Sequence, residues 1–376
     1  MYFSPKQCDP VSSTPEYKPL LEAFKQSIDW NLARKRAFST RSKAIENLDK
    51  HLIDFETHFT RNQGKIIWAP NAEAGKSELI SQSQGFTTFS MEHGLLDEMG
   101  LSGHKDWHYS EPDTSAKTPR CLIVFPDFYI SENGSLALHH SNSLTEKWMA
   151  DADKIIFVCG IEQVCPTMNE AENLIHLLAL QNGFPNDFPA IQFSFGNRNI
   201  KEKIGPKETY VLMLDNGRSE LLAAIPQRQA LYCIHCGACS KFSNFDKQQS
   251  APLSVIDALQ YPFTIGPTHF NDNFMFPLSG RATEACPVNI DLKGLVLENR
   301  KLAVDSKLDS RSDALAWKAW KTAMMSRKWL NKGGSMKNFT FRSFYKKPWG
   351  NQREFPKTAD QSFNEWWQET RGKSEI

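Results

Sequence analysis

The alternation of apolar and polar residues divides the chain into helical and extended segments. Between residues 19 and 62, apolar side chains recur at steps of three and four residues, which predicts two amphipathic helices. The residues that set this spacing are Leu20, Leu21, Phe24, Ile28, Ala44, Leu48, Leu52, Phe55 and Phe59. Residues 170–181 (EAENLIHLLALQ) have the same periodicity and predict a further helix.

Short apolar runs between these helices predict β-strands. They occupy residues 65–69, 121–125, 154–160, 190–195 and 209–214. The run at 128–138 predicts a strand pair that turns at Asn133-Gly134, a favoured hairpin dipeptide. Because strands alternate with helices, we expect an α/β domain over 63–225.

Strand signals fade after residue 225. Helical spacing returns at 253–260, 290–303 and 311–328, while 329–376 is rich in Trp, Phe, Lys and Pro with little periodicity. The last stretch is expected to wrap over the surface of this protein or of a partner. The pattern predicts four parts: an N-terminal arm with a helix pair (1–62), the α/β domain (63–225), a helical cysteine-bearing domain (226–310), and a C-terminal helix with a wrapping tail (311–376).

Composition and charge limit the cellular compartment and the binding partners that we expect for this protein. Lys and Arg total 44 against 43 Asp and Glu, a net charge of +1, so there is no electrostatic case for nucleic acid. No apolar stretch reaches the roughly 18 residues that a transmembrane helix needs. The first ten residues lack the apolar core of a secretory signal. We therefore expect a cytoplasmic protein without a transmembrane segment.

Four of the eight cysteines form a pattern with a chemical meaning. Residues 233–239 read CIHCGAC, and 46 residues separate Cys239 from Cys286, which directly precedes Pro287. In two-cluster ferredoxins, one cubane takes three cysteines from one C-x-x-C-x-x-C run and the cysteine before proline from the other run. The spacing therefore predicts one [4Fe–4S] cluster on Cys233, Cys236, Cys239 and Cys286.

The ligands of a second cubane are missing. The positions that the same spacing would assign to them hold Ser243, Phe276, Ser279 and Ala282. Zinc and the absence of any metal remain alternatives for the four cysteines. Zinc sites usually pair two C-x-x-C knuckles, whereas here the ligands divide three and one, which favours iron–sulfur. A bound cluster could serve in electron transfer or only in holding the fold together.

Polar residues at strand ends are candidates for ligand binding. Glu132 and Gly134 lie in the turn ENGS at 132–135, and a simple hairpin turn is the alternative interpretation. Glu162 follows the predicted strand 154–160. Asn216 and Arg218 follow the strand 209–214, where Arg218 could hold a carboxylate in a bidentate manner or merely begin a helix. The sequence contains no G-x-S-x-G, Walker or G-x-G-x-x-G motif, so no catalytic residue is assigned.

Several segments together resemble the LutB-type iron–sulfur protein of bacterial lactate utilisation, a member of the LUD-domain family. They are AIENLDKHLIDFE (44–56), ISENGSLAL (130–138), GIEQVCPT (160–167), LDNGRSELL (214–222), LYCIHCGAC (231–239), ATEACPVNIDL (282–292) and REFPKTADQSFNEWW (353–367). The resemblance implies an α/β LUD-like domain, related to the NagB and CoA-transferase sheet, followed by an α-helical ferredoxin-like domain. It also implies a place beside a cysteine-rich subunit and a second LUD-domain subunit in a complex that oxidises L-lactate to pyruvate.

The sequence departs from the family in two respects. It keeps the ligands of one cubane where members generally have two, and the region before residue 130 is shorter and lacks the family's Ser/Lys-rich segment. The expected function is an iron–sulfur electron-transfer subunit of the lactate-oxidising complex, an accessory rather than a catalytic chain. A non-enzymatic scaffold with a structural [4Fe–4S] cluster, or an electron-transfer subunit for another 2-hydroxy acid, are the alternatives.

Overall fold

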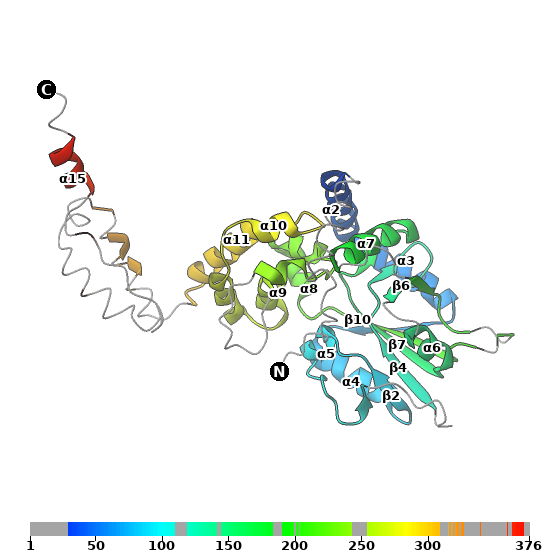
Figure 1. Cartoon of the computed structure of the whole chain (residues 1–376). Coiled ribbons are helices and arrows are strands. Elements are labelled where there is room, and N and C mark those ends of the chain that lie inside the picture. Colours follow the sequence, from blue (N-terminus) through cyan, green and yellow to red (C-terminus); the bar gives the residue numbers. More distant parts are fainter. Residues whose placement is uncertain are drawn as a thin grey trace. The chain divides into compact units, whose positions relative to one another are not determined.

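The computed structural model describes residues 29–109, 119–140, 144–182, 190–198, 201–202, 204–242 and 254–308, with scattered positions from 315 to 359 and residues 363–371. The chain divides into two compact units, Met1–Leu308 and Asp309–Ile376. In the second unit the helix α15 (Phe363–Thr370) is described (Figure 1). The predicted N-terminal arm, Ser243, and most of the predicted helix 311–328 and tail lie outside the described residues.

A six-stranded sheet organises the first unit (Figure 1). Every neighbouring pair in it is parallel, and helices alternate with its strands, which confirms the predicted α/β domain. Its strands, in spatial order, are β1 (Lys65–Ala69), β10 (Glu208–Leu214), β7 (Lys154–Gly160), β4 (Arg120–Val124), β2 (Thr87–Ser90) and β3 (Trp107–His108). The predicted strands 65–69, 121–125, 154–160 and 209–214 correspond to β1, β4, β7 and β10, whereas β2 and β3 were not predicted.

Alternate residues of the central strands pack into two separate cores. Ile156 and Val158 of β7 point to one face, where α4 (Ala72–Ser83) and α5 (Gly94–Glu98) contribute Leu79 and Leu96. Ile155 and Phe157 belong to the core on the other face, which includes residues of four helices before residue 183 as well as residues between 221 and 296. The four helices are α2 (Trp30–Glu46), α3 (Leu48–Arg61), α6 (Leu144–Asp151) and α7 (Met168–Asn182).

A second, four-stranded sheet has the order β8-β5-β6-β9. Its strands are β8 (Val164–Cys165), β5 (Phe128–Ile130), β6 (Ser135–His140) and β9 (Ala190–Ser194). The antiparallel pairing of β5 with β6 across Asn133-Gly134 confirms the predicted strand pair.

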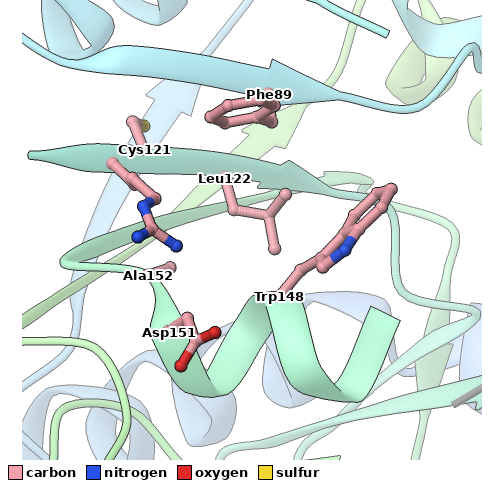
Figure 2. A pocket seen from close by; sticks show the side chains of 7 residues that line it. Phe89, Cys121, Leu122, Trp148, Asp151 and Ala152 are labelled. Atoms are coloured by element: carbon pink, nitrogen blue, oxygen red, sulfur yellow. The ribbon is translucent and has the colours of Figure 1, made fainter. Parts of the chain in front are cut away.

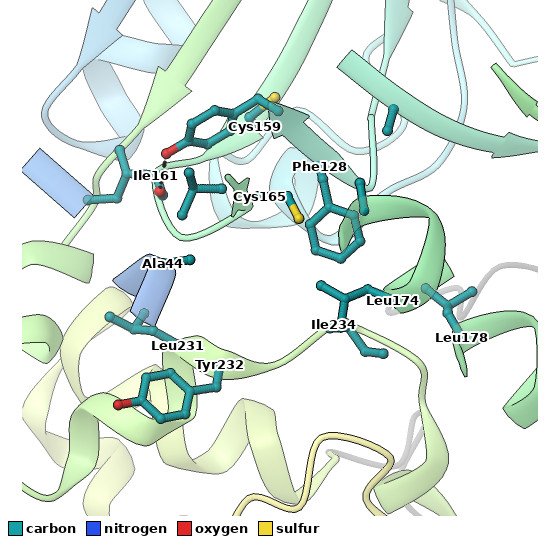
Figure 3. Packing of buried hydrophobic residues seen from close by; sticks show 14 of the residues in the cluster. Ala44, Phe128, Cys159, Ile161, Cys165, Leu174, Leu178, Leu231, Tyr232 and Ile234 are labelled. Atoms are coloured by element: carbon teal, nitrogen blue, oxygen red, sulfur yellow. Dashed lines mark hydrogen bonds between the residues drawn. The ribbon is translucent and has the colours of Figure 1, made fainter. Parts of the chain in front are cut away.

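Among the described residues of 215–308, the regular elements are all helices, joined by turns and by the irregular loop 233–237. The elements are α8 (Arg218–Ala223), the 3₁₀ helices η2 (Gln227–Tyr232) and η3 (Ala238–Phe242), α9 (Val255–Thr264), η4 (Pro267–Met275), α10 (Arg281–Ala285) and α11 (Leu292–Asp305). Residues Leu231, Tyr232 and Ile234 share one hydrophobic core with Phe128 and Cys165 of the second sheet (Figure 3). The cysteine-bearing region is therefore packed onto the α/β part. In the part of the chain that the structure describes, no helix is long and apolar enough to cross a membrane.

Candidate functional site

The four predicted cysteine ligands are neighbours. Cys233 directly follows η2, Cys239 lies in η3, and Cys286 ends α10, which packs against η3. Cys239 and Cys286 are each 8% exposed, while Cys233 and Cys236 are half-buried. The loop that carries the first three cysteines thus has a buried side and an accessible side.

Desolvation by the surrounding protein raises the pKa of all four thiols, to about 12 for Cys236 and about 11 for Cys239. For Cys233, negative charge on Cys236, Cys239 and Cys286 raises the pKa further. Four thiolates could therefore coexist here only beside compensating positive charge, such as the iron of a cluster.

Backbone N–H groups approach every one of the four sulfurs and partly offset these upward shifts. The His235 N–H donates to Cys233 Sγ at 3.2 Å. The backbone N–H groups of Ala238, Ile256, Val288 and Ile290 likewise act to lower the pKa of Cys236, Cys239 and Cys286. Hydrogen bonds from the backbone to the sulfurs are one of the features that tune iron–sulfur sites.

The donor set fits an iron–sulfur cubane in chemistry, burial and backbone hydrogen bonding. Within the described ranges, no three His, Cys, Asp or Glu side chains converge into a group that could hold a metal ion. A single Zn²⁺ would need all its thiolates at about 2.3 Å, whereas a cubane spreads its four ligands over separate iron atoms. The loop curls through left-handed backbone at His235 (φ 53°) and Gly237 (φ 70°). A Cβ on Gly237 would meet nothing within 4 Å, so backbone conformation rather than close approach favours glycine there.

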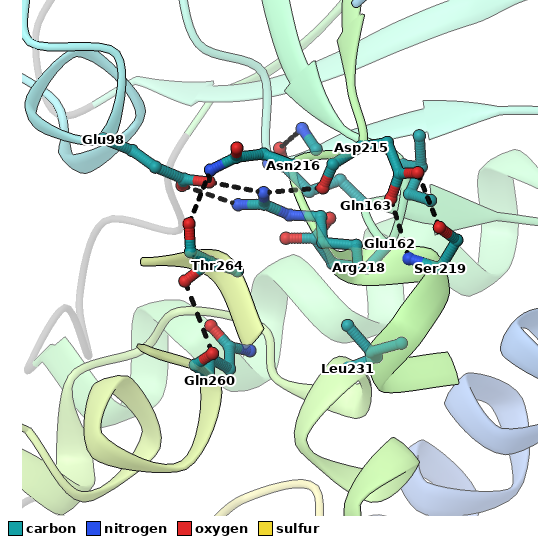
Figure 4. Close-up of polar contacts among 12 residues, drawn as sticks. Glu98, Glu162, Gln163, Asp215, Asn216, Arg218, Ser219, Leu231, Gln260 and Thr264 are labelled. Carbon is teal, nitrogen blue, oxygen red and sulfur yellow. Dashed lines mark hydrogen bonds and ion pairs between the residues drawn. The ribbon is translucent and has the colours of Figure 1, made fainter. Parts of the chain in front are cut away.

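Three of the predicted ligand-binding residues meet at the carboxyl edge of the parallel sheet (Figure 4). Arg218 donates from Nη1 and Nη2 to Glu98 Oε1 and Oε2 at 2.7 and 2.9 Å. Its Nε lies 2.7 Å from Glu162 Oε2, a charge contact outside hydrogen-bond geometry. Asn216 Nδ2 donates to Glu98 Oε1 at 2.6 Å and to the Thr264 carbonyl of α9 at 3.0 Å. Arg218 therefore holds a carboxylate in bidentate fashion, but the carboxylate belongs to its own chain.

This network is buried and charged. The side chains of Arg218, Glu98 and Glu162 are 6%, 13% and 2% exposed. Burial alone would raise the pKa of Glu162, but the adjacent Arg218 charge outweighs it and holds that pKa below its ordinary value. The two carboxylates in turn raise the pKa of Arg218, against the effect of its burial. Glu162 and Arg218 are therefore ionised at neutral pH, and the network joins α5, the ends of β7 and β10, and the start of α8.

The cysteine loop faces the same edge of the sheet. His235 Nε2 lies 3.9 Å from Glu162 Oε1, and the His235 side chain is 48% exposed. The carboxyl ends of parallel strands are the usual ligand-binding edge of α/β sheets. The fold thus places the four-cysteine site beside the polar edge of the α/β part.

Glu132 and Gly134 contact helices. The Glu132 carboxylate accepts from the Met168 N–H at 3.3 Å, at the first turn of α7. Gly134 has a φ of 71°, and a Cβ there would lie 2.4 Å from the Phe59 backbone nitrogen of α3. In the described structure these two residues shape the β5–β6 turn against α3 and α7, apart from the Arg218 network.

Sequence reasoning missed three charged residues of this region, namely Glu98, Arg34 and Arg41. Glu98 belongs to the Arg218 network, and both arginines donate to carbonyls of the cysteine-bearing segments. No local sequence pattern identifies these residues, because their partners lie between 118 and 252 residues away along the chain. The four cysteines, by contrast, stand out through spacing alone.

A small recess opens elsewhere, between α6 and the strands β2 and β4 (Figure 2). Phe89, Leu122 and Trp148 form its apolar lining, and Arg120 and Asp151 are the charged residues among those that line it. None of the predicted site residues lines this recess, so it is separate from the cysteine site.

Comparison with known proteins identifies a domain family for the α/β part of the chain. The LUD domain matches residues 53–214, the stretch that contains most of α3 and both sheets. The chain is also similar to a Deinococcus radiodurans DUF162-family protein of known crystal structure, with a TM-score of 0.35 and 17% identity over 44% of this chain and 98% of the other.

Two curated relatives extend the similarity over nearly the whole chain. Lactate utilization protein B of Bacillus cytotoxicus and that of Bacillus cereus (strain AH820) are each 28% identical, over 94% of this chain and 91% of theirs. The chain therefore carries a LUD domain and is similar to LutB-type proteins over nearly its whole length. The alignment with the Bacillus cytotoxicus protein runs over 434 positions, more than the 376 residues of this chain, so the relative has segments that this chain lacks.

Proposed function

We propose that this chain is an iron–sulfur electron-transfer subunit of a complex that oxidises L-lactate to pyruvate. Cys233, Cys236, Cys239 and Cys286 hold one [4Fe–4S] cluster in this proposal, and the bound cluster supplies one-electron transfer. A cysteine-rich subunit and a second LUD-domain subunit are the proposed partners. The chain is an accessory subunit and contributes no catalytic residue of its own.

The observation that carries the proposal is the meeting of four thiols from two distant segments, each sulfur approached by backbone N–H groups. Burial raises the pKa of these thiols and so keeps them protonated in the absence of metal. Binding of iron would replace the protons and turn the thiols into thiolate ligands. The similarity to proteins named Lactate utilization protein B supports lactate utilisation as the setting.

The residues around the thiols perform three tasks in this proposal. The core formed by Val255, Val288 and Leu295 excludes water from Cys239 and Cys286. The backbone donors stabilise negative charge on sulfur. The accessible side of the loop, at His235 and Gly237, is where an electron partner approaches, because both residues are exposed.

Genetic complementation tests this function. A strain of the source organism without this gene should fail to grow on L-lactate, and the wild-type gene should restore growth. Cys286→Ala should not restore it, whereas Cys121→Ala should, because Cys121 is a buried cysteine of β4 outside the four-cysteine site. Full growth with Cys286→Ala would contradict the proposal, and a growth defect confined to another 2-hydroxy acid would change the substrate.

A redox titration separates electron transfer from a purely structural role. A relay must cycle between oxidised and reduced forms within the potential range of [4Fe–4S] proteins, about −700 to +450 mV. A cluster that stays in one form across this range would identify the chain as a scaffold.

A further inference from the structure

Helix α2 contacts both halves of the cysteine site through two arginines. Arg34 donates from Nε to the carbonyl of Cys286 at 2.8 Å and from Nη2 to the carbonyl of Thr283 at 2.7 Å. Arg41 donates to the carbonyls of Leu231 and Tyr232, the two residues before Cys233, at 2.8 and 3.2 Å. The two cysteine segments are thereby attached to the same helix.

The spacing of the two arginines matches this task. Seven residues are close to two full turns of an α-helix, so Arg34 and Arg41 lie on one face, about 10 Å apart along the axis. Arg36, between them on the same helix, is exposed. Arg34 and Arg41 thus lie on the face of α2 that contacts the cysteine segments, and Arg36 does not.

Arg41 is a buried cation with an unusual set of partners. Its side chain is 0% exposed, and it also donates to the carbonyls of Glu162 and Val164 in the α/β part. All four acceptors are neutral carbonyls, and in the described residues no carboxylate forms an ion pair with it. Burying a cation without enough negative charge nearby is costly. The Glu162 carboxylate supplies some of this charge but is paired with Arg218, so a further anion is expected. A thiolate-ligated cluster at the adjacent cysteines carries net negative charge and meets that need.

We propose that Arg34 and Arg41 are positioning residues of the cysteine site, which hold its two segments together on α2 and raise the reduction potential of the cluster bound there. This inference rests on the proposed function, since it assumes an iron–sulfur cluster on the four cysteines. Reduction adds negative charge to the cluster, and nearby positive charge stabilises the reduced form more than the oxidised form. Loss of one arginine charge therefore lowers the potential.

The test compares four variants of the full chain purified without oxygen, one of which, Arg41→Lys, keeps the charge of the buried arginine. Arg34→Gln removes the charge, Arg34→Lys keeps the charge but loses the forked donor geometry, and Arg36→Gln removes an exposed charge from the same helix. Two quantities are measured: the midpoint potential by EPR-monitored titration, and the rate at which a chelator removes iron.

Arg34→Gln should reduce the equilibrium constant for one-electron reduction by about two- to tenfold, where tenfold corresponds to 59 mV. It should also lose iron severalfold faster than wild type. Arg34→Lys should keep a potential near that of wild type while losing iron as fast as Arg34→Gln. Arg36→Gln should match wild type in both measurements, and Arg41→Lys should lose iron faster without a large change in potential.

The outcomes distinguish this inference from the function on which it rests. Wild-type protein without iron would overturn the proposed function and this inference with it. Wild-type protein with about four irons, together with an Arg34→Gln variant that matches Arg36→Gln in potential and iron loss, would overturn the arginine roles alone. A variant that loses iron faster at an unchanged potential, in both Arg34→Gln and Arg34→Lys, would overturn the electrostatic role.

Discussion

Replacing Arg218 by methionine tests the buried network at the carboxyl edge of the sheet. The substitution removes both hydrogen bonds to Glu98 and the 2.7 Å charge contact with Glu162, and leaves two carboxylates with little access to water. Breaking one buried ion pair in this way costs about 3–5 kcal/mol. Because two carboxylates lose the same cation, we expect Arg218→Met to lower the free energy of unfolding by about 5 kcal/mol at pH 8.

The destabilisation should depend on pH with a definite sign. In the wild type, Arg218 holds the pKa of Glu162 below its ordinary value, so this stabilisation is present at neutral pH and is lost only as the pH falls through that lowered pKa. Without Arg218, burial is the largest effect on Glu162 and raises its pKa above its unfolded value. As the pH falls, Glu162 of the variant therefore takes up a proton on folding. The difference in the free energy of unfolding between wild type and variant then becomes smaller.

Urea denaturation followed by tryptophan fluorescence at pH 8 and pH 5.5 measures both effects. Arg36→Met, at an exposed position on α2, is the matched control and should change the free energy of unfolding by less than about 0.5 kcal/mol. The double variant Glu162→Gln/Arg218→Met should be more stable than Arg218→Met alone, because one stranded charge is gone. The reasoning is refuted if Arg218→Met costs no more than Arg36→Met, or costs the same at both pH values.

Three further outcomes follow from other parts of the structure. Gly134→Ala should destabilise the protein by about 2–4 kcal/mol in urea denaturation, because its Cβ would collide with the backbone of α3, whereas Gly85→Ala, also at positive φ but with open space around it, should cost only about 1 kcal/mol. The pKa of His139 is raised because its hydrogen bond and charge contact with Asp127 outweigh the effect of burial, so wild type should gain stability over His139→Gln as the pH falls from 8 to 6, and an equal difference at both pH values would contradict this. Burial raises the pKa of Cys121 to about 12, so iodoacetamide at pH 8 should leave this thiol unmodified in the native protein and label it after unfolding, as read by mass spectrometry.

The parallel sheet could be predicted where its strands are continuously apolar. β7 (KIIFVCG) and β10 (ETYVLML) are buried on both faces, so their sequences lack the alternation of an exposed strand and are easily recognised. β2 reads TTFS, with three hydroxyl side chains in four residues, and was not predicted although Thr88 is buried at its centre. Its place follows from pairing with β4 and β3, which is tertiary information.

The candidate site likewise contains residues that the sequence identifies and residues that only the structure identifies. The cysteines could be found because ligand spacing is written locally in the chain, at 233–239 and before Pro287. Arg218 was singled out for its ability to hold a carboxylate, but its partner Glu98 lies 120 residues away and no spacing connects the two. Arg41 sits in a helix where a charged residue suggests a surface position, and only the assembled fold surrounds it with four carbonyls. Long-range charge partners of this kind carry no periodic signal.

EPR spectroscopy of protein purified without oxygen, before and after dithionite, tests the central claim most directly when iron and sulfide are counted on the same sample. The account predicts about four irons and four sulfides per chain and a cubane signal on reduction, abolished in Cys286→Ala and retained in Cys121→Ala. Zinc in place of iron, or a Cys286→Ala variant that keeps the full signal, would contradict it.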